Sequence, residues 1–289
     1  MKPATATMGR ILLNRVIMSA TALLLGAAIW LASPAARAET IKIGGTGSAL
    51  GTMQQLGKVF ASANPGTTVV VVPSLSSGGG IKAALAGSID IAVSARPAKA
   101  EEATAGINMA AYARTAFVIA TPKTNPTSSL TLREVADIYA GRRPAWPDGT
   151  PVRVILRPAG DSDNMALQEM SPEVNAALSE ALAKKDTTGM AVAMNDQEAA
   201  NLLEKTPGAI GSSTLALLVS ENRSLKALAI NGVSPSAKTL ADGSYPYYRT
   251  FYAGTTAKLS PAAAKFMAFL RSPAAAAIIQ ENGQIPARD

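Results

Sequence analysis

Residues 67–82 read TTVVVVPSLSSGGGIK, an apolar run that leads directly into a glycine-rich turn. Four consecutive valines predict a strand covered on both faces, as in a parallel sheet between helices. Ser76, Ser77 and three glycines follow the run. Glycine lets the backbone approach a bound group, and serine hydroxyls can donate hydrogen bonds to it. The stretch therefore predicts a strand, an anion-binding turn and a helix, with a flexible linker as the alternative.

The rest of the chain continues this alternation of strands and helices. Short β-rich runs predict further strands at residues 41–44, 89–94, 116–120, 152–156, 209–211 and 248–253. Helices are predicted over residues 50–63, after a capping box at Thr131–Glu134, and after three serine–proline pairs at 171–172, 260–261 and 272–273. Such alternation is typical of an α/β fold with mainly parallel sheets.

The first 38 residues have the pattern of a secretory signal peptide. A basic segment precedes an apolar stretch at residues 16–31, and Ala36-Arg37-Ala38 is a small-x-small cleavage site. A transmembrane anchor is the alternative, but the apolar stretch is near the short limit for a membrane span. We therefore expect export to the periplasm, with cleavage after Ala38.

Composition excludes several classes of function. Four of the 27 Lys and Arg and none of the 20 Asp and Glu lie in the signal peptide, so residues 39–289 carry a net charge of +3 (23 − 20). This small charge argues against a nucleic-acid partner. The chain has no Cys and no His, which excludes disulfides, catalysis by Ser-His-Asp or Cys-His groups, and His-ligated zinc. An enzyme would have to use carboxylates, Lys, Tyr or Ser.

Two proline-containing connectors suggest two lobes. Residues 121–126 follow a predicted strand, and residues 243–246 precede the last long one. We predict that residues 39–120 and 246–289 form the first lobe and that residues 121–245 form the second.

Three strand-to-helix junctions, at residues 44–51, 76–80 and 157–164, carry small polar residues. The first two are rich in Gly with Ser or Thr, and the third contains two Asp residues. In an open parallel sheet, ligands bind beyond the carboxyl ends of the strands, where helix N-termini favour an anion. Residues 41–89 contain no Asp or Glu, which also favours an anion. Arg96 follows a further strand, and Arg157 begins the third junction. An arginine can hold an oxyanion with its planar fork of N–H donors.

Two motifs of other protein classes match this sequence only in part. The first junction has its third glycine one residue late for a dinucleotide loop, and no acidic residue follows for a ribose. Ser162-Asp163-Asn164 matches the S-D-N triplet of penicillin-recognising enzymes, but residues 39–289 lack the partner Ser-x-x-Lys motif. A serine or carboxylate hydrolase without histidine is the alternative of another class, and a sensory protein whose lobes bind a partner is a third.

Several longer stretches resemble the periplasmic phosphate-binding proteins of ABC transporters: GTGS (45–48), SSGGGIKA (76–83), GSIDIAVSARP (87–97), WPDGTPVRVILRPAG (146–160), PGAIGSS (207–213), DGSYPYYRTFYA (242–253) and SPAAAAIIQENGQIP (272–286). The resemblance implies a two-lobed periplasmic-binding-protein fold in which each lobe has a mainly parallel sheet flanked by helices. It implies a non-enzymatic, monomeric protein that closes on one phosphate, without metal or cofactor, and presents it to a membrane permease.

Carried over by position, the resemblance implies a ligand site made of Ser48, the backbone of Ala49, Ser76, Ser77, Gly78, Ser94, Arg96, Arg157, Gly160, Asp161, Ser162 and Asp163. The sequence departs from the family at two places. Ala95 stands where some members have an aspartate that accepts the proton of phosphate. Asp161 and Asp163 stand where the family has serine and threonine.

These departures lead to a hypothesis. Asp161 or Asp163 has become the proton acceptor, and Arg96 adds a second positive charge. Protonated phosphate would then bind in preference to sulfate. The alternative is that both acids cap a helix and face solvent. Another oxyanion or a small organic anion is the alternative ligand.

Overall fold

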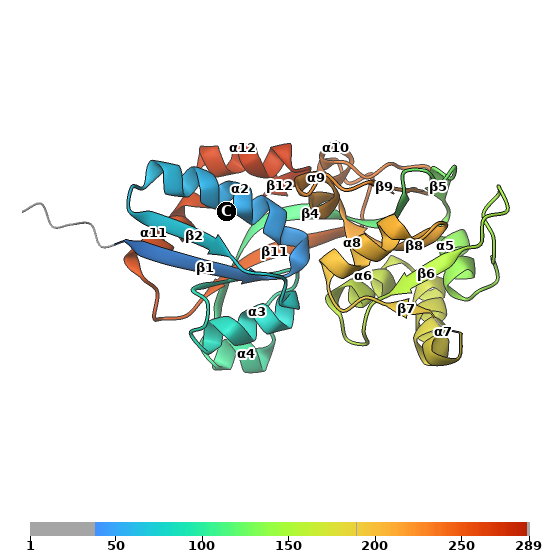
Figure 1. The fold of residues 1–289 in the computed structure, drawn as a ribbon, viewed down its shortest axis with the longest axis horizontal. Coiled ribbons are helices and arrows are strands. Elements are labelled where there is room, and N and C mark those ends of the chain that lie inside the picture. The colour runs from blue at the N-terminus through green and yellow to red at the C-terminus, as the bar shows by residue number, and fades with distance from the viewer. Residues whose placement is uncertain (1–37, 189, 288–289) are drawn as a thin grey trace, which may run out of the picture. The chain divides into compact units, whose positions relative to one another are not determined.

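The predicted strands join one ten-stranded sheet in the computed structural model, which describes residues 38–188 and 190–287 (Figure 1). The predicted signal peptide lies outside these residues, apart from Ala38. The strands are β1 (Glu39–Gly45), β2 (Thr67–Val71), β3 (Ile91–Ser94), β4 (Asn108–Pro122), β5 (Ser129–Leu130), β6 (Arg153–Leu156), β7 (Ala191–Val192), β8 (Ala209–Thr214), β9 (Leu225–Ala227), β10 (Ala229–Ile230), β11 (Tyr248–Thr255) and β12 (Gln284–Pro286). The short strands β5 and β10 pair separately.

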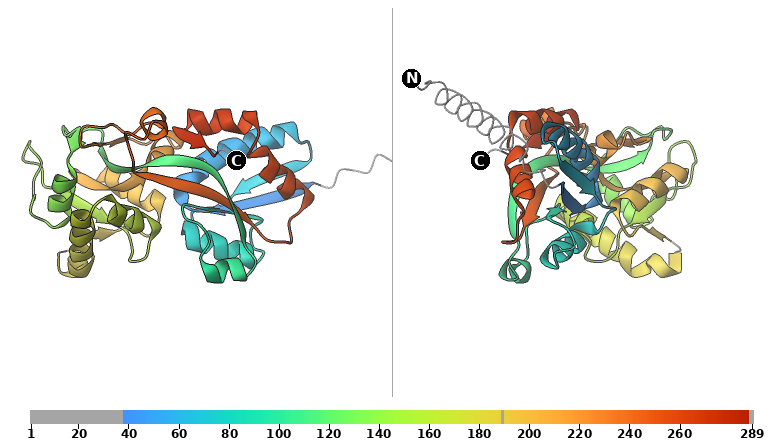
Figure 2. Two further views of the ribbon diagram at one scale, coloured as in Figure 1. Left: turned by 180° about the vertical axis from the view of Figure 1, so that it is seen from behind. Right: turned by 60° about the vertical axis from the view of Figure 1, so that its left-hand side comes forward.

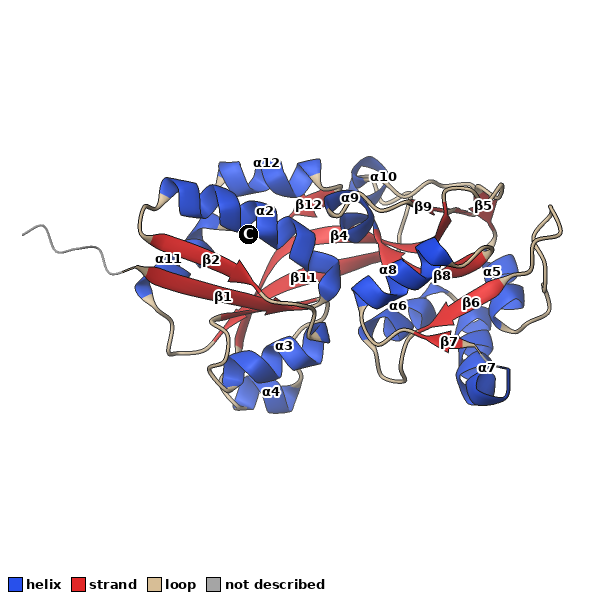
Figure 3. Ribbon diagram, viewed as in Figure 1, coloured by secondary structure: helices blue, strands red, loops and turns tan. Residues whose placement is uncertain are grey.

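Helices cover the sheet on both faces (Figure 3). They are α2 (Gly47–Ala63), α3 (Ser76–Leu85), α4 (Ala100–Thr104), α5 (Leu132–Tyr139), α6 (Ser162–Met170), α7 (Pro172–Thr188), α8 (Asp196–Lys205), α9 (Leu215–Ser220), α10 (Ala237–Ala241), α11 (Pro261–Phe269) and α12 (Pro273–Glu281). Among the described residues, no single helix is long and apolar enough to cross a membrane. Helices α11 and α12 would meet that test only as a pair, and they are bent by 64° at their junction.

Two blocks of parallel strands form two lobes. Strands β2, β1 and β3 are parallel in the first lobe, and β7, β6 and β8 are parallel in the second. The long strand β4 connects the blocks, because it pairs antiparallel with β11 over residues 108–116 and with β8 over residues 117–120. Figure 2 shows β4 and β11 running side by side. This architecture confirms the predicted two-lobed α/β fold.

Each lobe has its own hydrophobic core. Ile43, Phe60 and Phe266 belong to the cluster of the first lobe, whereas Phe117 and Tyr139 belong to that of the second. The rings of Phe60 and Phe266 meet edge to face, with centroids 5.1 Å apart. Because β4 contributes residue 113 to the first cluster and residues 116–120 to the second, the lobe boundaries at residues 120/121 and 245/246 stay a prediction.

The valine-rich run forms a strand, but its predicted position in the sheet is wrong. Strand β2 lies at the edge of the sheet and pairs with β1. Alternate residues are exposed, and Val70 keeps 40% of its surface accessible. A continuous run of β-branched residues predicts a strand, but it does not predict whether both faces of that strand are buried. An edge strand can expose part of an apolar run.

The glycines of the first two junctions have a structural role. Gly45 has φ +146°, and a Cβ atom there would lie 1.8 Å from the carbonyl oxygen of Val93. A Cβ atom on Gly80 would lie 2.5 Å from the Cα atom of Gly45. Helix α3 therefore packs directly on the end of β1, and only glycine fits at these two positions. By contrast, Gly78 and Gly79 are exposed.

The helix-start signals act as predicted. Thr131 and Glu134 form the reciprocal capping box of α5, with Thr131 N–H donating to the Glu134 carboxylate at 2.8 Å. The Ser260 hydroxyl accepts from the N–H of Ala263 at 3.2 Å, directly before Pro261. Helix α2 differs, because it begins at Gly47 and not at Leu50. The first glycine-rich junction is therefore itself a helix N-terminus.

We expect Ser260→Ala to lower the free energy of unfolding by about 1 kcal/mol, since it removes the acceptor for a free N–H group of α11. Urea unfolding followed by circular dichroism measures this change. Ser179→Ala is the matched control, because Ser179 is an exposed serine inside α7. Equal effects of the two substitutions would contradict a capping role.

Candidate functional site

The first junction holds an anionic group in the structure. Ser48, in the first turn of α2, donates its hydroxyl to Oδ1 of Asp196 at 2.8 Å. The hydroxyl of Thr46 lies 3.4 Å from Oδ2 of the same carboxylate. Asp196 begins α8 in the second lobe and is buried. A carboxylate of one lobe is therefore bound by hydroxyls at a helix N-terminus of the other, where the helix dipole also favours negative charge.

The N-termini of α2 and α8 are in close contact. The side-chain amide of Gln197 donates to the carbonyl oxygen of Gly47 at 2.9 Å. A Cβ atom at Gly47 would lie 2.1 Å from Oε1 of Gln197 and 2.8 Å from Cβ of Asp196. Glycine at position 47 thus lets the two lobes approach each other.

Arg157 is buried at the carboxyl end of β6, with 2% of its side chain exposed. Its Nη2 and Nε atoms lie 3.0 and 3.4 Å from the carboxylate oxygens of Asp161, and Nη1 donates to the carbonyl oxygen of Ala193 at 3.2 Å. Burial lowers the pKa of Arg157, but the charges of Asp196, Asp163 and Asp161 outweigh it and raise the pKa. The guanidinium is thus a fixed positive charge among three carboxyl groups.

Asp163 does not face solvent, since only 3% of its surface is exposed. Burial, with the nearby charges of Asp196 and Asp161, raises the pKa of Asp163 to about 7, although Arg157 and Arg249 oppose the rise. The hydroxyl of Ser212 on β8 lies 3.2 Å from its Oδ2 atom. The protonated form of this carboxyl is therefore stabilised relative to that of an ordinary aspartate.

Asp161 combines two roles. It is the N-cap of α6, because its Oδ1 atom accepts from the N–H of Asp163 at 2.9 Å, and it is also the ion-pair partner of Arg157. The alternative that both acids cap a helix and face solvent is therefore wrong about solvent. One of them caps the helix while neutralising the arginine, and the other is buried beside it.

The second positive charge comes from Arg249 and not from Arg96. Both Nη atoms of Arg96 bond to the Glu102 carboxylate at 2.7 Å. Arg249, on β11, is 7% exposed, and its Nη1 atom donates to the carbonyl oxygen of Ser162 at 2.6 Å. The charged cluster around Asp163 thus contains two guanidinium groups, those of Arg157 and Arg249, and three carboxyl groups, Asp161, Asp163 and Asp196. Its charge is balanced when Asp163 is protonated.

The other predicted residues have varied surroundings. Ser77 is buried and accepts from the N–H of Ala95 at 3.0 Å, so it ties α3 to the end of β3. The hydroxyl of Ser94 donates to the carbonyl oxygen of Arg96 at 2.7 Å. The N–H of Ala49 donates to the carbonyl oxygen of Thr46. The backbone of Ser76 has a positive φ of 58°. Gly78 and Gly160 are exposed.

Sequence reasoning missed Asp196, Arg249, Thr46 and Ser212. A weak signal existed for Asp196, because Asn195 and Asp196 begin a helix directly after a short apolar strand, as the residues of the other junctions do. Arg249 lies within strand β11, so it is not part of a strand-to-helix junction that could mark it in the sequence. Only the tertiary structure places it beside α6, where it donates to the carbonyl oxygen of Ser162.

The comparisons with known proteins agree with this architecture. Residues 32–274 match the model of the PBP superfamily domain. A phosphate-binding protein PstS of Bacillus subtilis (strain 168) is 33% identical over 89 residues, which are 30% of this chain and 29% of that protein. A PstS 2 protein of Streptococcus agalactiae is 27% identical over 108 residues, which are 37% of this chain and 36% of that protein. The matches thus span about a third of the length of these relatives.

Two solved structures share the fold over most of the chain. A phosphate ABC transporter substrate-binding protein with bound phosphate from Clostridium perfringens has a TM-score of 0.72 at 23% identity, and the match covers 86% of this chain and 100% of that one. An ABC-type phosphate transport receptor from Vibrio cholerae has a TM-score of 0.57 at 22% identity, with coverage of 85% and 99%. These two structures show the shared fold, and the family model shows that this chain belongs to the PBP superfamily.

Proposed function

We propose that this protein is an exported solute-binding protein that captures phosphate, or a similar tetrahedral oxyanion, and delivers it to an ABC importer. The observation that supports this proposal most directly is the carboxylate of Asp196 between the hydroxyls of Ser48 and Thr46. The N-terminus of α2 therefore stabilises an oxyanion at the position where the sequence predicts phosphate. Phosphate would take the place of the carboxylate when the lobes separate.

The charges around this position favour a protonated ligand. Arg157 supplies a buried cation, but Asp161 and Asp163 lie beside it. A phosphate that carries a proton can donate it to a carboxylate, whereas sulfate has no proton at neutral pH and would meet repulsion. Closure of the lobes would strengthen these charge-assisted hydrogen bonds by removing water.

The relatives support the transport role, since they are named as phosphate-binding proteins and receptors of ABC transporters. The predicted signal peptide supports export to the periplasm. We expect the mature chain to act as a monomer and to present its ligand to a membrane permease, without catalysis.

Calorimetry of the purified protein against phosphate, sulfate, molybdate and arsenate tests the proposal. We expect phosphate and arsenate to bind and sulfate to bind much more weakly. Ser48→Ala should weaken phosphate binding about ten- to a hundredfold, because a hydrogen bond to a charged group is lost. Ser62→Ala, at the exposed C-terminal end of the same helix, is the control. If none of the four anions bound, the proposal would be wrong.

A further inference from the structure

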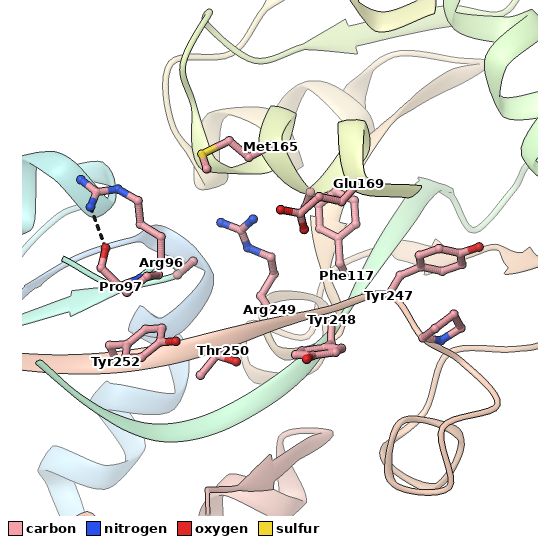
Figure 4. Close-up of a pocket in the computed structure, with 13 residues that line it drawn as sticks. Arg96, Pro97, Phe117, Met165, Glu169, Tyr247, Tyr248, Arg249, Thr250 and Tyr252 are labelled. Carbon is pink, nitrogen blue, oxygen red and sulfur yellow. Dashed lines mark hydrogen bonds between the residues drawn. The ribbon is translucent and has the colours of Figure 1, made fainter. Parts of the chain in front are cut away.

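A separate cavity of about 390 Å³ lies between the loop after β3, helix α6 and strand β11. Figure 4 shows the side chains that line it. Arg96 and Pro97 come from the first of these elements, Met165 and Glu169 from the second, and Arg249 from the third. Inorganic phosphate would fill only a small part of this volume, which lies in the range of pockets for small organic ligands.

Arg249 lines this cavity, and one edge of its guanidinium group has no hydrogen-bond partner. The Nη1 atom is bonded to the carbonyl oxygen of Ser162. The Nε and Nη2 atoms are both buried and have no hydrogen-bond partner. These two N–H groups point in the same direction, and such a pair matches the two oxygens of a carboxylate. Buried donors without partners are costly, so this edge is suited to receive an acceptor.

No carboxylate of the described part of the chain forms an ion pair with Arg249, although Asp163 is close enough to feel its charge. Figure 4 shows its guanidinium group between Met165 and Glu169. Glu169 and Met165 are exposed, and 44% of the Met165 surface is accessible. A flexible methionine can move aside to admit a ligand to the buried N–H groups.

The remaining lining is suited to an organic body. Phe117, Met165, Ala166 and the ring of Tyr247 provide apolar surface. Tyr252 and Thr250 add hydroxyl groups along β11 (Figure 4). Arg96 also lines the cavity, but its charge is paired with Glu102. The charge of Arg249, with Glu169 nearby, therefore favours a monoanion over a dianion.

From this geometry we propose that the cavity is a second anion site, which binds a small organic monocarboxylate through the Nε and Nη2 atoms of Arg249. The carboxylate lies in the plane of the guanidinium group, and an aromatic or short aliphatic body lies against the apolar lining. The lining of this cavity does not include Ser48, Thr46 or Arg157, although Arg249 also lies close to Asp163.

Calorimetry with benzoate, 4-hydroxybenzoate and hexanoate tests the proposal, and benzamide serves as the uncharged control. We expect at least one of the three carboxylates to bind and benzamide not to bind. Arg249→Lys keeps the charge but removes the paired N–H groups, so it should weaken carboxylate binding about ten- to a hundredfold. Glu169→Gln should strengthen binding severalfold, because it removes a neighbouring negative charge. Thermal unfolding verifies that both variants fold.

The two sites can be tested independently. Ser48→Ala should reduce phosphate binding and leave carboxylate binding unchanged. If phosphate did not bind but a carboxylate did, the proposed transport of phosphate would fail and the site at Arg249 would stand. If all three carboxylates failed to bind at millimolar concentrations, or if their binding survived Arg249→Lys unchanged, the site at Arg249 would be refuted.

Discussion

Replacing Arg157 by methionine is expected to lower the free energy of unfolding by about 3–5 kcal/mol and to abolish oxyanion binding. The side chain is 2% exposed and is bonded to Asp161. Methionine fills similar space but leaves Asp161, Asp163 and Asp196 with one nearby guanidinium group, that of Arg249. The main cost is the uncompensated negative charge in a buried environment, and the same charge would repel an incoming anion.

Urea unfolding and calorimetry with phosphate measure the two effects. Arg153→Met is the matched control, because Arg153 begins the strand that Arg157 follows but is exposed, and we expect it to change stability by less than about 0.5 kcal/mol. Adding Asp161→Asn to Arg157→Met should recover part of the lost stability, since the two residues are coupled. Phosphate binding that persisted in Arg157→Met would show that this arginine does not hold the anion.

The second large effect concerns the pH dependence of stability. The pKa of Asp163 is about 7 in the folded protein, whereas an aspartate in an unfolded chain has a pKa of about 3.9. The folded state therefore binds the proton more tightly, and stability falls as the pH rises between these two values. Below about pH 4 this cost is absent, and above about pH 7 it is complete, of order 4 kcal/mol for this one group.

Asp163→Asn should remove this pH-dependent loss of stability, because asparagine does not titrate. Asparagine has a similar shape and can still accept a hydrogen bond from Ser212. We expect the variant to gain stability relative to the natural protein as the pH rises from 4 to 8, measured by urea unfolding at each pH. Asp148→Asn, in an exposed turn, is the control. A constant difference between the natural protein and the variant across this range would mean that Asp163 titrates normally.

The Asp163→Asn variant also tests the selectivity between phosphate and sulfate. If Asp163 accepts the proton of phosphate, Asp163→Asn should reduce the preference for phosphate over sulfate. Asp161→Asn should have a different effect, because it frees the guanidinium group of Arg157 and so strengthens the binding of both anions. Unchanged discrimination in both variants would exclude these carboxyl groups as the basis of selectivity.

Much of the fold could be predicted from local patterns. Ser260-Pro261 and Ser272-Pro273 begin helices where predicted, and the apolar run at residues 67–72 forms a strand. These signals depend on residues that are close together in the sequence, namely on propensity and on capping bonds within one turn. The edge position of β2 could not be predicted in this way, because it depends on which strand lies beside it.

The sequence by itself determined the α/β class, the strand-to-helix junctions and the presence of hydroxyls and arginines at them. Only the tertiary structure decided the electrostatics of the charged cluster around Asp163. Asp196 meets Ser48 across 148 positions of the chain, and Arg249 meets Ser162 across 87. Burial raises the pKa of Asp163, and an ion pair with Glu102 neutralises Arg96. Burial and charge pairing depend on distances in space, so a list of charged residues along the chain could not supply them.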